Sequence, residues 1–126
     1  MKARLITILF IVFIVFIVAL ANAGLVYKAF PFITSMPGQD KTGHFVLMGS
    51  MAFLANFSLG GRRVRVWCIR PYSGSLIVLI FVIVEECSQF FIMTRTFGLG
   101  DLAADILGIL VLGNIGGVLG QKLPPR

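Results

Sequence analysis

The fold is decided by the stretch SGSLIVLIFVIVEECSQFFIM at residues 73–93, which is mainly apolar and yet carries two adjacent acids. A helix that crosses the hydrocarbon core of a bilayer needs about 20 mainly apolar residues. Three more stretches are of this kind, and the four predicted spans are approximately 5–26, 41–59, 73–93 and 102–120. The sequence therefore predicts an all-α membrane protein.

The second predicted span is the least apolar of the four. Its apolar part, residues 45–59, is too short to cross a bilayer alone and reaches the required length only with residues 41–44, which read KTGH. The first turn of this helix must therefore carry polar side chains into the membrane.

The composition fits this interpretation. Of the 126 residues, 58% are apolar and 13% are charged, whereas soluble domains average about half and a quarter. The chain is short enough to form a single domain over residues 1–126. Its net charge of +6 could indicate nucleic acid in a soluble protein, but the basic residues cluster between the apolar stretches. Membrane topology explains them better, and no nucleic-acid partner is predicted.

Lysine and arginine are unevenly distributed among the loops, which predicts an orientation. In a four-span bundle, one side carries Lys2, Arg4, Arg62, Arg63, Arg65, Arg70, Lys122 and Arg126, and the other carries only Lys28, Lys41 and Arg95. The positive-inside rule assigns the larger group to the cytoplasm. Because the loops are short, neighbouring helices should be antiparallel. We expect a four-transmembrane-helix up-down bundle with both termini cytoplasmic.

The first span also has features of a secretory signal, since residues 21–23 (Ala-Asn-Ala) resemble a cleavage site. The apolar core of such a signal is usually about 7–15 residues long. Here the apolar run is longer and continues through Val26, so we expect it to be retained as a span.

All five acidic residues fall on the non-cytoplasmic side of this topology, which is the main functional indication. Ionisable groups at membrane depth are costly and usually mark a site. Residues three or four apart share a helix face, so three helices each present a polar stripe at this side. The predicted binding cluster is Asp40, Lys41, His44, Glu85, Glu86, Gln89, Arg95, Asp101 and Asp105. The alternative is an ion-pair network that only holds the helices together.

His44 is the single histidine of the chain. It is either a proton carrier near neutral pH or a helix-start histidine hydrogen-bonded to an acid. One histidine with scattered acids is a weak pattern for a metal site, and Cys68 and Cys87 have no metal-binding spacing and are not expected to form a disulfide. No metal or cofactor is therefore predicted.

The fourth span contains two small-residue motifs, Gly113-x-x-x-Gly117 and Gly116-x-x-x-Gly120. Glycines at this spacing let helix backbones approach closely. Packing within the bundle is the simpler interpretation and self-association the other, so the sequence predicts no oligomeric state. Gly108, one turn after Asp105, is expected to leave room beneath that acid.

These polar residues resemble the VanZ-like family of small bacterial membrane proteins. The matching pattern, within approximately residues 35–120, is Asp40-Lys41-x-x-His44-Phe45, Glu86-x-x-Gln89, Arg95, Asp101-Leu102, Asp105 and Gly108. Many members carry Asn where this chain has Asp105, so the local charge is more negative here. The resemblance implies a protein of the bacterial inner membrane and cell envelope, and the namesake of the family is linked to low-level teicoplanin resistance.

Three functional hypotheses follow. In the first, the cluster binds the headgroup of an envelope lipid or amphiphile, with Lys41 and Arg95 contacting phosphate or carboxylate; this would alter the access of a lipid-anchored antibiotic. In the second, the protein is a membrane-embedded enzyme acting on an envelope lipid, with Glu86 or Asp105 as general base and His44 as proton carrier. In the third, it is a structural accessory subunit. The first is favoured, with membrane lipids as the expected partners, and whether the protein is an enzyme stays open.

Overall fold

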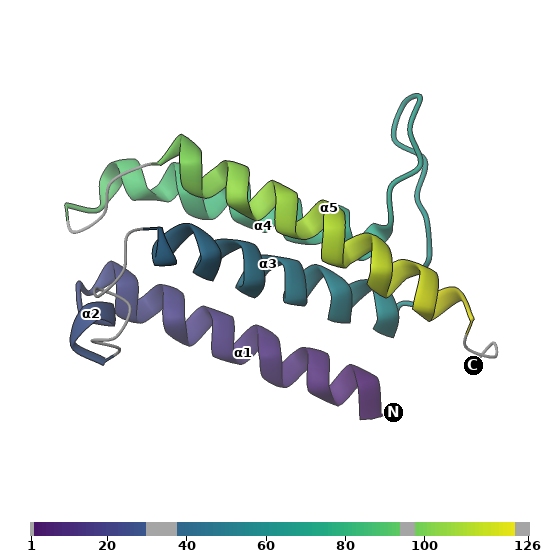
Figure 1. Ribbon diagram of the computed structural model, residues 1–126, viewed down its shortest axis with the longest axis horizontal. Helices are drawn as coiled ribbons and strands as arrows, with labels where there is room; N and C mark the ends of the chain where they lie inside the picture. The colour runs from purple at the N-terminus through teal and green to yellow at the C-terminus, as the bar shows by residue number, and fades with distance from the viewer. Residues whose placement is uncertain (1, 30–37, 94–97, 123–126) are drawn as a thin grey trace.

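The computed structural model describes residues 2–29, 38–93 and 98–122, and within these ranges the chain is helical with no β-strand. The four long helices are α1 (Lys2–Asn22), α3 (Gln39–Ser58), α4 (Ser73–Ser88) and α5 (Leu99–Gln121). Two short elements accompany them, α2 (Val26–Ala29) and the 3-10 helix η2 (Gln89–Phe91). The long helices run up and down side by side, with the start of α1 and the end of α5 at the same end of the bundle (Figure 1). The predicted all-α fold is confirmed.

Three of the helical stretches described are long and apolar enough to cross a membrane, as expected of a membrane protein. They are Arg4–Asn22, Ser73–Phe91 and Leu99–Gln121. Helix α3 has 20 residues but is not among them, because its first turns are polar. The fourth span and the cytoplasmic position of the two ends therefore stay predictions.

Helix α3 lies at the centre of the bundle. It packs against α1, α4 and α5, most extensively against α5. The buried apolar core lies around it and is made of Ile14, Met48, Met51, Ala52, Val78, Val82 and Ile109. A helix that faces lipid must be apolar, whereas one packed against other helices can keep polar side chains that find partners in the protein. Its position therefore explains how α3 can be the least apolar long helix.

Glycines bring α5 against α3. A Cβ atom added at Gly108 would meet the carbonyl oxygen of Phe45, and one added at Gly116 would meet that of Phe53. Gly113, Gly117 and Gly120 are also buried inside the bundle. The small-residue motifs are thus used in packing within the chain. Gly108 makes room for the α3 backbone, which differs from the expected space beneath Asp105.

Helix α1 lies at the edge of the bundle and has most of its large apolar side chains exposed, on a surface that lipid would cover. It contacts α3 through buried Ile14 and through the Thr7 hydroxyl, which donates to the carbonyl oxygen of Leu54 (3.2 Å). It ends at Asn22, four residues before the predicted end of the first span. Gly24 has a left-handed φ of 70°, and the Leu25 N–H donates to the Leu20 carbonyl (2.8 Å), which is a helix-terminating Schellman motif.

The loop between α3 and α4 is a hairpin that projects from the bundle at the end where α1 begins and α5 ends (Figure 1). Backbone hydrogen bonds from Val64 to Pro71 (3.1 Å) and between Val66 and Ile69 (3.0 Å) hold it together. This hairpin carries Arg62, Arg63, Arg65 and Arg70, and Cys68 within it is exposed and free. The largest basic group of the chain and the acids of α3, α4 and α5 therefore lie at opposite ends of the bundle.

Candidate functional site

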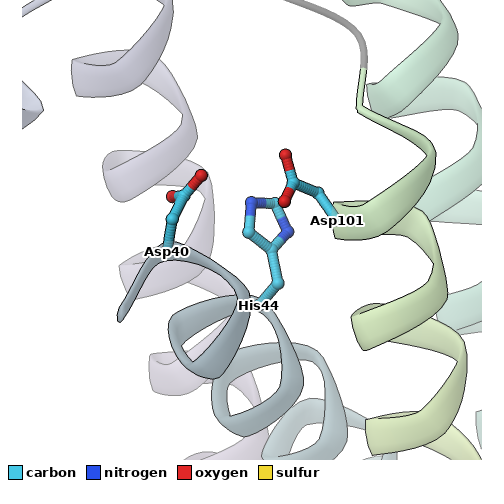
Figure 2. Close-up of side chains that lie close together, drawn as sticks. All are labelled: Asp40, His44 and Asp101. Carbon is cyan, nitrogen blue, oxygen red and sulfur yellow. The ribbon is translucent and has the colours of Figure 1, made fainter. Parts of the chain in front are cut away.

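The acidic residues meet where α3 and α5 begin and α4 ends, which we call the acidic end. Asp40 and His44 come from the first turns of α3, Asp101 and Asp105 from those of α5, and Glu86 from the last turn of α4. In Figure 2 the imidazole ring of His44 lies between the carboxylates of Asp40 and Asp101. Helices on either side of the ring thus each contribute a carboxylate.

The deepest contact joins α3 to α5. Nδ1 of His44 is 3.1 Å from each of the two carboxylate oxygens of Asp105. Asp105 is 1% exposed and the His44 side chain 17%. Of the two predicted roles for His44, the hydrogen bond to an acid is present in the structure.

Glu86 is buried next to this pair. It is 1% exposed, and neither of its carboxylate oxygens has a hydrogen-bond partner among the residues that the structure describes. Glu86, His44 and Asp105 each have one oxygen or nitrogen atom that lies within 4.8 Å of the corresponding atoms of the other two. Burying a charged carboxylate without a partner is costly. A bound proton or a ligand would remove this cost.

Lys41 and Asp101 form the outer rim of the site. Lys41 Nζ is 3.7 Å from Oδ1 of Asp101, and the two side chains are 60% and 19% exposed. Asp40 is exposed, and one ligand atom each from Asp40, His44 and Asp101 also lie within 4.8 Å of one another. Because Lys41 is largely exposed and the distance is long, this ion pair is weak, and the Lys41 ammonium group is accessible to another anion.

Glu85 and Gln89 form a separate contact on α4 and η2. The amide Nε2 of Gln89 donates to Oε2 of Glu85 (3.0 Å), and the Ser88 hydroxyl donates to the Glu85 carbonyl (2.6 Å). Glu85 and Gln89 are four residues apart, a spacing that makes two side chains neighbours on one helix face. The α-helix ends at Ser88 and continues as η2 to Phe91, short of the predicted α-helical span to Met93.

The structure brings nearly all of the predicted site together at the acidic end. Arg95, which was expected to bind an anion beside Lys41, lies outside the described residues. The remaining candidates are Asp40, Lys41, His44, Glu85, Glu86, Gln89, Asp101 and Asp105.

A second polar group, which the sequence analysis missed, lies around Asn56 in α3. Asn56 is fully buried; its Nδ2 donates to Ser75 Oγ (2.7 Å) and to the Gly113 carbonyl (2.9 Å), and its Oδ1 accepts from the Ser75 N–H (3.0 Å). The sequence feature that could have indicated this group is a single asparagine within an apolar run. Because its polar atoms are satisfied, this group ties α3, α4 and α5 together and leaves nothing for a ligand.

The chain matches no protein-family model, no curated protein and no solved structure. Fold and site therefore define only a class of protein: a helical bundle with helices long and apolar enough to span a membrane and a histidine–carboxylate cluster at one end. Such a cluster can bind a cation, accept and donate a proton, or bind a polar headgroup.

Proposed function

We propose that this chain is an integral protein of the bacterial inner membrane whose acidic end, in the outer leaflet, binds the headgroup of an envelope lipid or amphiphile. Lys41 carries this proposal. It is a largely exposed cation at the rim of a buried polar cluster, and its contact with Asp101 is only a loose one of 3.7 Å. Such an ammonium group is available to a phosphate or carboxylate brought in by a ligand.

The balance of charge at the acidic end limits which headgroups can bind there. Five acids, Asp40, Glu85, Glu86, Asp101 and Asp105, face one histidine and two described lysines, Lys41 and the Lys28 of α2, which lies at the same end (Figure 1). A purely anionic headgroup would be repelled by this excess of negative charge. A headgroup with both a phosphate and an amine fits better, with the phosphate on Lys41 and the ammonium near the carboxylates of Asp40 and Asp101.

The distribution of basic residues supports the orientation in this proposal. The arginine-rich hairpin, the start of α1 and the end of α5 lie at the end opposite the acids (Figure 1). By the positive-inside rule this end faces the cytoplasm, and the acidic end then faces the outer leaflet.

The VanZ-like pattern in the sequence supports the link to the cell envelope. All its described polar residues belong to the acidic end, which is the arrangement that a shared site would need. On this reading, binding at the acidic end changes how a lipid-anchored glycopeptide such as teicoplanin reaches the membrane surface. Deleting the protein should then change teicoplanin susceptibility, and equal susceptibility with and without it would count against this link.

The binding proposal is tested with the purified full chain in nanodiscs. The binding of fluorescent phosphatidylethanolamine is compared with that of phosphatidylglycerol for the wild type, Lys41→Ala and Asp101→Asn. Lys122→Ala is the matched control, because it removes an exposed lysine at the opposite end. We expect tighter binding of phosphatidylethanolamine by the wild type and roughly 3- to 10-fold weaker binding by Lys41→Ala, as for the loss of one hydrogen bond at a largely exposed side chain. Equal binding by Lys41→Ala and Lys122→Ala would overturn the proposal.

A second candidate function, catalysis on an envelope lipid, is favoured by one observation. Glu86 is buried, has no hydrogen-bond partner among the described residues and lies close to His44. In that function Glu86 is the general base and His44 carries the proton onward. Glu86→Gln would then abolish turnover of a bound lipid without weakening its binding, whereas loss of binding or of folded protein alone would argue against catalysis.

A further inference from the structure

We propose that His44, Glu86 and Asp105 form a binding site for one divalent transition-metal ion, such as Zn²⁺ or Mn²⁺. This site is distinct from the rim formed by Lys41 and Asp101, and it does not depend on headgroup binding.

The three side chains are already close to the spacing of metal ligands. One ligand atom from each lies within 4.8 Å of the other two, and Nδ1 of His44 is 3.1 Å from the Asp105 oxygens. Ligands about 2.1 Å from a metal and at right angles to one another are about 3.0 Å apart. The histidine and the aspartate thus need little movement to share an ion.

Glu86 provides the independent reason to place a ligand here. Its carboxylate is buried, has an oxygen within 4.8 Å of ligand atoms of His44 and Asp105, and makes no hydrogen bond within the described part of the chain. The nearby amide of Gln89 donates to Glu85. A divalent cation would satisfy the Glu86 carboxylate and cancel the two negative charges of Glu86 and Asp105 at once, which removes the largest cost of burying them.

The donor set indicates which metals fit. Ca²⁺ and Mg²⁺ prefer sites built from oxygen ligands, with six or more positions around the ion. One imidazole nitrogen with two carboxylates favours a first-row transition metal instead. Three protein ligands also leave a coordination position for water or for an oxygen of a ligand.

The more exposed group of Asp40, His44 and Asp101 competes for the same histidine. Asp40 is exposed, and Asp101 is already paired with Lys41. The deeper group has two carboxylates at 1% exposure, where water competes least for the ion. The deeper group is therefore the metal site.

The experiment uses the full chain in detergent, stripped with a chelator and titrated with Zn²⁺ and Mn²⁺ by isothermal calorimetry, with Mg²⁺ and Ca²⁺ for comparison. The variants are Glu86→Gln and Asp105→Asn, both close in shape to the natural residue. Glu85→Gln is the matched control, since it changes the adjacent buried acid, whose partner is Gln89. Circular dichroism and gel filtration establish that each variant is folded.

We expect one Zn²⁺ or Mn²⁺ per wild-type chain, with affinity at least about tenfold lower in Glu86→Gln and Asp105→Asn than in Glu85→Gln, which removes the same charge beside the site but no ligand; even loss of an outer partner of a metal ligand costs 10- to 100-fold. Absence of binding by the wild type at micromolar free ion, or equal binding by folded Glu86→Gln, would overturn the site. Because Lys41→Ala is predicted to keep the metal and lose the headgroup, failure of one proposal is distinguishable from failure of the other.

Discussion

His44 and Asp105 are 61 residues apart in the chain, and their side chains meet between α3 and α5 with Nδ1 at 3.1 Å from both carboxylate oxygens. This contact connects the two helices that pack most extensively against each other. It also forms the inner boundary of the acidic end, beneath the rim of Lys41 and Asp101.

His44 and Asp105 should be energetically coupled to each other. Removing one partner leaves the other buried and unsatisfied, so His44→Ala and Asp105→Ala should each lower the free energy of unfolding, while the double variant should lose less than their sum. We expect a coupling energy of about 1–3 kcal/mol, in the range for residues in direct contact. The measurement is a double-mutant cycle by denaturant unfolding in detergent micelles at one pH. Strictly additive effects would show that the contact contributes nothing to stability.

Substituting alanine for two glycines should change the free energy of unfolding in opposite directions. At Gly108 an added Cβ meets the Phe45 carbonyl, so Gly108→Ala should push α5 from α3 and cost about 1–3 kcal/mol, as overpacking does. At Gly43 in α3 an added Cβ meets none of the described residues within 4 Å, so Gly43→Ala should stabilise the protein by about 0.5–1 kcal/mol through helix propensity. Thermal unfolding of the two variants under the same conditions checks both. A loss of stability at Gly43 equal to that at Gly108 would contradict the close helix approach.

The buried Asn56 group should be important for stability. Asn56→Ala removes hydrogen bonds to α4 and α5, and hydrogen bonds between membrane helices average about 0.6 kcal/mol with a maximum near 1.7. We expect a loss of about 2 kcal/mol in unfolding free energy. Asn114→Ala is the control, because Asn114 is exposed and, within the described residues, donates to the Leu110 carbonyl of its own helix; its effect should stay within about 0.5 kcal/mol. Similar stability of the two variants would mean that Asn56 does not hold the three helices together.

The orientation can be read from cysteine accessibility. Cys68 is exposed in the arginine-rich hairpin, so a membrane-impermeant maleimide should label it only after intact cells are permeabilised. Thr42 is exposed near the start of α3. In a Cys68→Ser, Cys87→Ser background, Thr42→Cys should be labelled in intact cells if the reagent reaches the outer leaflet surface. Labelling of Cys68 from outside would reverse the topology and move the acidic end to the cytoplasmic side.

The sequence predicted the elements that depend on composition and missed those that depend on how helices turn toward one another. Long apolar runs placed the four long helices, and charge separated the hairpin from the acids. The first helix ends at Asn22 because Gly24 adopts a left-handed conformation. A hydropathy pattern carries no information about this backbone conformation. The gathering of acids at one end followed from topology, whereas the contact between His44 and Asp105 depends on the rotation of two helices about their axes. Asn56 was overlooked because a single amide hardly changes the hydropathy of its run.

The central claim is that the acidic end is a binding site and not only a scaffold, and native mass spectrometry of co-purified lipid tests it most directly. Lys41 suits this test because its side chain is 60% exposed, so Lys41→Ala should leave folding and abundance unchanged. The wild type and Lys122→Ala are predicted to retain a lipid or amphiphile through purification, and Lys41→Ala to lose it at equal protein level. Retention of the same ligand by all three proteins, or its absence from the wild type, would contradict the claim.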